Sequence, residues 1–160
     1  MSGQHVAVSD CERIRPGLIG QPANAASSLA FIAVAVPMWR RHKAWRGVAA
    51  ALAFEGLGSV AYHGPGGRIS KFVHDIGLLF ILLGFGRVAR DDPKSLRPRP
   101  LAVVLGACAV LLHTLSRTGG PLCSCNSRLQ GHAVFHVLAA AAIASQSFSE
   151  SGVLSAGARS

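Results

Sequence analysis

The chain has 160 residues, enough for one compact domain, and half of them are hydrophobic. The mean hydropathy of +0.39 and the 14% share of charged residues are typical of a membrane protein and argue against an ordinary soluble domain. The formal net charge of +9 does not point to nucleic acid, because the basic residues lie in short loops between apolar runs. We therefore expect no nucleic-acid partner.

Five apolar segments predict membrane-spanning helices in chain order. Each has about 17–18 residues, near the lower limit for crossing a bilayer as a helix. They are rich in Gly, Ala and Ser, and small residues let membrane helices pack closely. We predict one all-α, polytopic transmembrane bundle over 1–160, with an outer N-terminal segment (1–21) and a flexible tail (150–160). The predicted spans are residues 23–39, 46–62, 72–89, 100–116 and 132–149.

The loops between these segments differ in their content of basic residues. The first and third loops contain most of the lysines and arginines, whereas the second and fourth contain two each. By the positive-inside rule, loops one and three and the C-terminus are cytoplasmic, and the N-terminus faces outward. The Gly/Ala-rich spans and the high Arg content are compatible with a GC-rich bacterial genome. We therefore expect a bacterial plasma membrane.

Polar residues stand at the ends of the apolar segments, all on the predicted outer side. Ser59 and His63 end the second segment, Asp75 begins the third, and His132 and His136 begin the fifth. Polar and ionisable groups are costly inside a membrane and usually mark a functional site. Because these residues lie at a similar predicted depth in the membrane, we predict that they form one site near the outer face.

The residue types in this group are suited to metal-dependent hydrolysis. His132 and His136 are four residues apart, so they share one helix face, and His63 is the candidate for a third ligand. Three neutral imidazoles with an open position form the ligand set of a catalytic zinc. Asp75 follows a short Gly-rich turn that should bring it near His63, where it would act as general base. The hydroxyl of Ser59 would bond the water or the developing oxyanion.

Other interpretations of the same residues exist. A lone His-x-x-x-His is often a packing pair, and a lone Asp at a helix start is often an N-cap. A receptor or sensor that keeps the metal-binding fold without turnover is the main alternative to an enzyme. A bis-histidine haem protein fits less well, because His132 and His136 lie on one helix. The presence of Ser59 and Asp75 beside the histidines favours a hydrolase, because a purely structural metal site would not need them.

Glu55 lies on the same predicted stripe as Ser59 and His63, about 12 Å from His63 along the helix axis. That distance is too large for a metal ligand. We interpret Glu55 as a buried hydrogen-bonding residue whose partners are Asn24, Ser27 or Ser28 on the first segment. The alternative is that Glu55 supports the site from behind its ligands or belongs to a proton path.

Three of the four cysteines, Cys11, Cys123 and Cys125, are predicted outside the membrane. A disulfide from Cys11 to either Cys123 or Cys125 would tie the N-terminal segment over the site. The competing hypothesis makes Cys123 and Cys125 soft metal ligands. Cys108, inside the fourth segment, is expected to be a packing residue.

Several motifs of this chain resemble the alkaline ceramidase family and its wider membrane-hydrolase group, the CREST superfamily, which also includes adiponectin/progestin-type receptors. The match covers most of the chain in the same order. The motifs are Asp10-Cys11-Glu12, Gln21-Pro-Ala-Asn24-x-x-Ser27-Ser-Leu-Ala-Phe31, Glu55-Gly-Leu-Gly-Ser59-x-x-x-His63, Asp75 and Gln130-Gly-His132-Ala-x-Phe-His136.

This resemblance implies a zinc ion held by His63, His132 and His136, and hydrolysis of an amide bond in a lipid or lipid-like substrate. The family has seven spans and this chain has five, so it resembles a shortened bacterial member. The family's calcium motif is incomplete here, and calcium prefers several carboxylate oxygens, so we do not expect calcium. Asp10, Glu12 and Asn24 are expected to support the site, and no obligate protein partner is evident.

Overall fold

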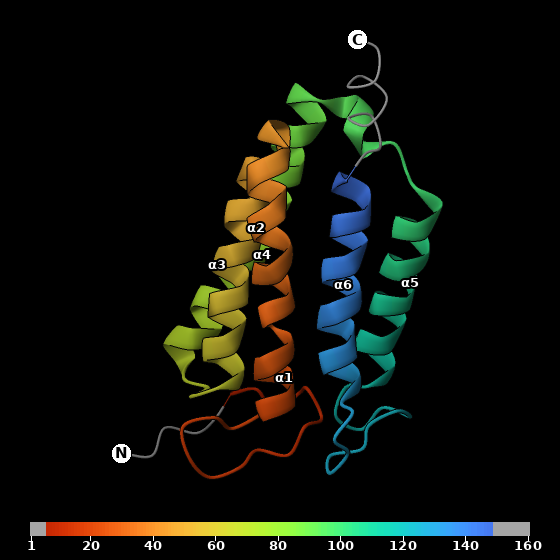
Figure 1. Ribbon diagram of the computed structural model, residues 1–160. Helices are drawn as coiled ribbons and strands as arrows, with labels where there is room; N and C mark the ends of the chain where they lie inside the picture. The colour runs from red at the N-terminus through yellow and green to blue at the C-terminus, as the bar shows by residue number, and fades with distance from the viewer. Residues whose placement is uncertain (1–5, 149–160) are drawn as a thin grey trace, which may run out of the picture.

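A computed structural model describes residues 6–148, and these residues form helices and loops without a strand (Figure 1). The all-α prediction is confirmed for this range. The predicted tail, 150–160, lies outside the described residues. The helices are α1 (Pro22–Ser27), α2 (Leu29–Arg41), the 3₁₀ helix η1 (Lys43–Trp45), α3 (Arg46–His63), α4 (Arg68–Asp91), the 3₁₀ helix η2 (Pro93–Leu96), α5 (Pro100–Leu115) and α6 (Gly131–Ser147).

Each predicted apolar segment corresponds to a helix, with α1 and α2 together forming the first. The largest difference is α4, which begins at Arg68 and ends at Asp91, beyond both predicted ends. Residues 64–67, Gly-Pro-Gly-Gly, separate α3 from α4, because glycine and proline are poor helix formers. The helix α4 therefore starts directly after Gly67. It includes the polar turn from Arg68 to Lys71, which precedes the predicted apolar segment.

Two helical segments are long and apolar enough to cross a membrane, judged by length and composition: Pro22–Arg41 and Arg68–Asp91. The apolar helix α5 is shorter. The helices α3 and α6, which carry Ser59 and the three histidines of the predicted site, do not meet the same criterion within the described range. Five membrane spans therefore remain a prediction.

The helices follow one another by contact in the order α4, α3, α2, α6, α5 (Figure 1). The outer helix α4 therefore packs mainly against α3, and α5 packs mainly against α6. Close packing between α3 and α4 depends on glycines. A Cβ atom on Gly84 would lie 3.1 Å from the Cα of Val48, and one on Gly58 would lie 3.2 Å from the Cα of His74. The expectation of a tightly packed bundle holds for this helix pair.

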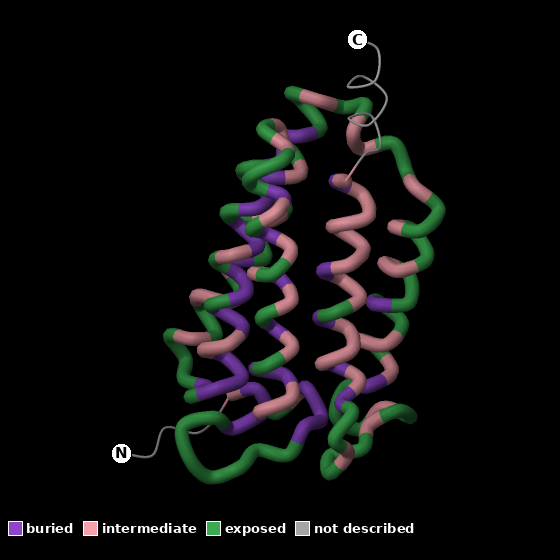
Figure 2. Tube along the Cα trace, in the orientation of Figure 1, coloured by how far each residue is buried: buried purple, intermediate pink, exposed green. Residues whose placement is uncertain are grey.

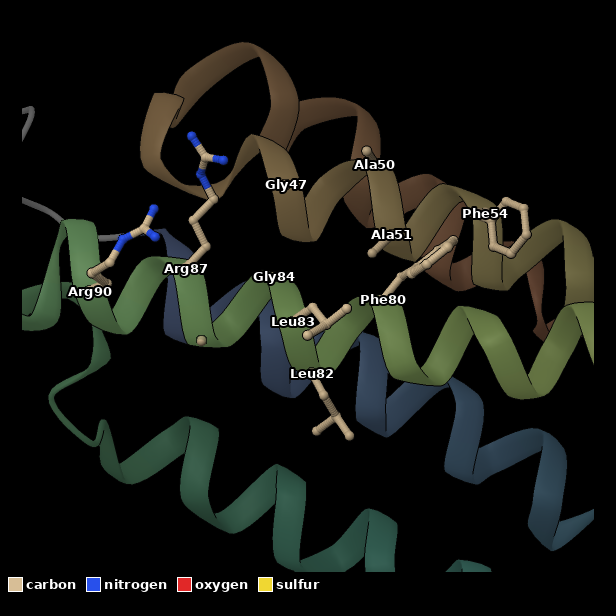
Figure 3. Close-up of a pocket in the computed structure, with 11 residues that line it drawn as sticks. Gly47, Ala50, Ala51, Phe54, Phe80, Leu82, Leu83, Gly84, Arg87 and Arg90 are labelled. Carbon is tan, nitrogen blue, oxygen red and sulfur yellow. The ribbon is translucent and has the colours of Figure 1, made fainter.

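Burial is greatest between the helices and at the end of the bundle where the N-terminal segment crosses (Figure 2). The outer faces of α4 and α5 are instead apolar and exposed, and between α3 and α4 lies a groove of about 790 Å³ lined by Phe54 and Phe80 (Figure 3). Exposed apolar residues on these faces include Leu78, Leu79, Phe80, Leu82, Leu83, Leu101, Val103, Val104, Val110 and Leu111.

Candidate metal centre

Three histidines meet at the end of the bundle where α3 finishes and α6 begins. His63, His132 and His136 are all buried, and one ring nitrogen from each lies within 4.8 Å of the others. The spacing of His132 and His136 places both rings on one face of α6, and their ring centroids are 4.5 Å apart. The group that the sequence predicted is therefore assembled in the structure and can hold a metal ion.

Two of the three rings are held by a hydrogen bond at Nδ1. His63 Nδ1 lies 2.7 Å from Gln21 Oε1, and His136 Nδ1 lies 2.9 Å from the hydroxyl of Ser27. Metal-binding histidines commonly use one nitrogen for the metal and the other for such a partner. With Nδ1 used in this way, Nε2 of His63 and Nε2 of His136 would be the metal-binding atoms.

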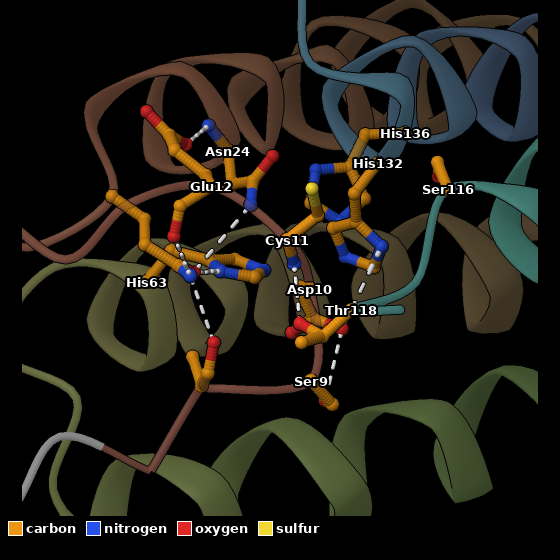
Figure 4. Close-up of polar contacts among 12 residues, drawn as sticks. Ser9, Asp10, Cys11, Glu12, Asn24, His63, Ser116, Thr118, His132 and His136 are labelled. Carbon is orange, nitrogen blue, oxygen red and sulfur yellow. Dashed lines mark hydrogen bonds and ion pairs between the residues drawn. The ribbon is translucent and has the colours of Figure 1, made fainter. Parts of the chain in front are cut away.

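The third ring, His132, lies next to a buried carboxylate from the N-terminal segment. Asp10 Oδ1 is 3.9 Å from His132 Nδ1, and Asp10 is only 4% exposed (Figure 4). Ser9 Oγ donates a hydrogen bond to Asp10 Oδ1 at 3.1 Å. Burial raises the pKa of the Asp10 carboxyl above its ordinary value. Asp10 is thus the acidic side chain that lies beside this histidine group, where we had predicted Asp75.

Ser59 is fully buried and reaches the histidines through a second serine. Its hydroxyl lies 2.8 Å from Ser28 Oγ, which in turn lies 3.4 Å from His136 Nδ1. The predicted placement of Ser59 near the histidines agrees with this chain of hydroxyls. Ser28 and Ser27 belong to the site as well, although the sequence had suggested them only as partners of Glu55.

Asp75 does not lie where we predicted it. Its side chain is 52% exposed and pairs with Lys71, and its other oxygen lies 3.4 Å from His74 Nδ1. Within residues 6–148 it bonds none of the three clustered histidines. At this level of α4, His74 packs against α3 beside Gly58. Because successive helical residues point about 100° apart, an inward His74 turns Asp75 toward the surface.

Glu55 is buried, as predicted, but its partner is on α4. Its Oε1 lies 3.2 Å from His74 Nε2, and its carboxylate occupies the space beside Gly77, where a Cβ atom would clash with it. The expected bonds to Asn24, Ser27 or Ser28 are absent among the described residues. The one missing side chain at Gly77 creates room on α4, so Glu55 turns toward that helix.

The N-terminal segment crosses the site end of the bundle and supplies several bonds to it (Figure 4). Glu12 accepts the backbone N–H groups of Ala23 and Asn24 at 2.9 and 2.8 Å, which caps the first turn of α1. Gln21 Nε2 donates to the carbonyls of Ala7 and Glu12, while its Oε1 is held by His63. Asn24 Nδ2 lies 3.4 Å from the same Gln21 oxygen. Asp10, Glu12 and Asn24 thus contribute to the site's surroundings.

A disulfide fixes this segment to the loop before α6. It joins Cys11 to Cys123, which selects one of the two predicted pairings. Cys125 keeps a free thiol, with its sulfur 3.8 Å from each of the bonded sulfurs. The sulfurs of Cys11, Cys123 and Cys125 also lie within 4.8 Å of one another, so metal binding by the reduced cysteines stays the competing hypothesis. Cys108 is exposed on α5, so the prediction that it packs in the interior is wrong.

Gln21 was not singled out as a site residue by the sequence, although it begins the Gln21-Pro-Ala-Asn24 motif. We expect Gln21→Leu to raise the zinc dissociation constant about 10- to 100-fold, because the orienting bond to His63 is lost. Competition with a chelator of known affinity measures this change. The matched control is Gln146→Leu, at the other end of the bundle, where Gln146 bonds the carbonyls of Ser95 and Arg97. Equal losses in both variants would contradict a specific role for Gln21.

Comparisons with known proteins found no match for this chain. No protein-family model matches the chain, and neither a curated protein nor a solved structure is similar to it.

Proposed function

We propose that this protein is a zinc-dependent integral-membrane hydrolase that cleaves an amide bond in a lipid or lipid-like substrate, as the resemblance to the alkaline ceramidases implies. The observation that carries the proposal is the group of three buried histidines, two of them with Nδ1 fixed by Gln21 and Ser27. A catalytic zinc takes three such ligands and keeps one position open. The arrangement therefore fits the ion that the sequence suggested.

The exposed surface supports insertion into a membrane. Leucine, valine and phenylalanine side chains cover the free faces of α4 and α5, and exposed apolar area on this scale is unusual for a soluble monomer. We propose the predicted orientation, with the N-terminal segment and the histidines outward and the C-terminus cytoplasmic. The basic loops then lie at the opposite end, in agreement with the positive-inside rule.

The described residues have distinct roles in the proposed reaction. His63, His132 and His136 would hold a zinc ion, which supplies Lewis acidity and lowers the pKa of a coordinated water. Asp10 lies beside His132 and takes the proton of the attacking water, in place of the exposed Asp75. The hydroxyls of Ser59 and Ser28 form a hydrogen-bonded pair that extends from the interior to His136. Because these hydroxyls meet the Nδ1 side of the ring, we propose that the pair holds His136 in its orientation toward the metal.

The proposal is tested with purified full-length protein in detergent and a panel of fluorogenic long-chain lipid amides, including ceramides. We expect hydrolysis that stops after treatment with a zinc chelator and returns when zinc is added. A zinc-containing protein that cleaves no amide in the panel would favour the receptor alternative. Hydrolysis that persists at full rate after zinc has been removed would contradict the proposed chemistry.

A further inference from the structure

A second polar site lies at the end of the bundle opposite the histidines. Three separate chain segments meet there around a pocket of about 690 Å³: the end of α2 with η1, the segment from Asp92 to Arg99, and the end of α6. We call it the basic pocket. Its cationic lining residues are Arg41, Lys43, Lys94, Arg97 and Arg99.

Among residues 6–148, the cations of the basic pocket outnumber the acidic groups that line it. Asp92 is the single acidic residue among its lining residues. Over residues 6–148, none of the five cations forms a salt bridge, whereas the nearby Arg87 and Arg90 both pair with Asp91. Five cations facing one carboxylate leave an excess of positive charge that attracts an anion.

Hydrogen bonds fix the walls of the pocket. Gln146 Nε2 donates to the carbonyls of Ser95 and Arg97 at 2.8 and 2.9 Å, which joins α6 to η2 and the residue after it. Arg99 donates to the carbonyl of Phe148 at 2.8 Å, at the end of α6. The positive-inside rule requires only that cytoplasmic loops carry basic residues. It does not require three distant segments to hold them around one hollow.

We propose that the basic pocket binds the phosphate-bearing headgroup of an anionic phospholipid. This inference rests on the membrane insertion proposed above, but not on hydrolysis. The 18 residues of α3 span about 27 Å, close to the roughly 30 Å hydrocarbon thickness of a bilayer. With the histidines near one membrane surface, the basic pocket lies at the other, at the depth of lipid phosphates. Basic pockets at the cytoplasmic surface are known to recognise such headgroups.

The test measures lipid binding to the purified full-length protein by native mass spectrometry. The probes are a short-chain phosphatidylglycerol and a phosphatidylcholine with the same acyl chains. We expect the wild-type protein to bind phosphatidylglycerol at least about tenfold more tightly. In the double variant Lys94→Gln/Arg97→Gln, we expect phosphatidylglycerol to bind about thirtyfold more weakly, at about fivefold for each basic residue removed.

The matched control is Arg87→Gln/Arg90→Gln, which removes the same charge at the same end of the bundle from residues already paired with Asp91. We expect this control to keep the wild-type lipid preference. Equal binding of both lipids by the wild type, or equal weakening in both double variants, would overturn the proposal. Full displacement of phosphatidylglycerol by equimolar inorganic phosphate would assign the pocket to a free anion. It would contradict the proposal that the bound phosphate belongs to a lipid.

The zinc content of the same samples separates this inference from the proposed hydrolase. We expect zinc binding to be unchanged in both double variants, because the two sites lie at opposite ends of α3. A protein that lacks zinc yet prefers phosphatidylglycerol would support the lipid site and contradict the hydrolase. A protein that holds zinc and hydrolyses amides without any lipid preference would support the hydrolase and contradict the lipid site.

Discussion

Replacing His136 with alanine is expected to reduce bound zinc from about one ion per chain to less than about 0.1, because two imidazoles do not retain a zinc ion that needs three protein ligands. His136 is 2% exposed and lies against both His63 and His132. Inductively coupled plasma mass spectrometry of the detergent-purified protein measures the metal content. Circular dichroism of the same sample establishes that the helices are retained.

The matched control for this experiment is His113→Ala. The ring of His113, on α5, lies 5.3 Å from that of His132, but His113 does not belong to the group whose donors converge. We expect this variant to keep its zinc. Loss of zinc from His113→Ala as well would mean that α5 contributes a ligand and that the three-histidine assignment is incomplete. Wild-type protein that folds well without any zinc would remove the basis of the hydrolase proposal.

The second large effect is expected at Asp10. Asn in place of Asp10 removes the proposed general base while keeping the size of the side chain, and we expect kcat to fall about 10²- to 10⁴-fold. Asp75→Asn should change kcat by less than about twofold, because an exposed pair with Lys71 contributes little. Both variants are measured with the lipid-amide substrate on which the wild type is most active.

Zinc content distinguishes two roles for Asp10. If Asp10 acts mainly by orienting His132, zinc affinity should fall together with kcat, since the two groups are 3.9 Å apart. If it takes the proton, zinc content should stay near that of the wild type while kcat falls. A larger loss of activity in Asp75→Asn than in Asp10→Asn would show that the assignment of the base to the N-terminal segment is wrong.

The helices and the pairing of His132 with His136 could be predicted because they depend on local patterns, whereas His63 was added as the candidate third ligand that the family resemblance also implied. Apolar runs interrupted by glycine, proline and charged residues define each helix within a few residues. The four-residue spacing places His132 and His136 on one face of α6, and the short connection after His63 leaves no freedom in the direction of α4. Each of these inferences needs only the geometry of one helix or one turn.

The positions of Asp75 and Glu55 could not be predicted because they depend on how two helices are rotated against each other. A rotation of one residue, about 100°, decides whether His74 or Asp75 faces α3. That rotation is set by contacts between Gly58 and His74 and between Gly77 and Glu55, which are distant in the sequence. The sequence showed that these glycines exist, but not which side chains they would meet.

The sequence by itself determined the all-helical architecture, the shared helix face of His132 and His136 and the concentration of basic residues in alternate loops, because composition and residue spacing fix these properties locally. Only the tertiary structure decided that Cys11 pairs with Cys123, that Gln21 and Ser27 hold two of the histidines, and that Asp10 replaces Asp75 beside them. These contacts join residues far apart in the chain, so they depend on how the N-terminal segment folds across the bundle.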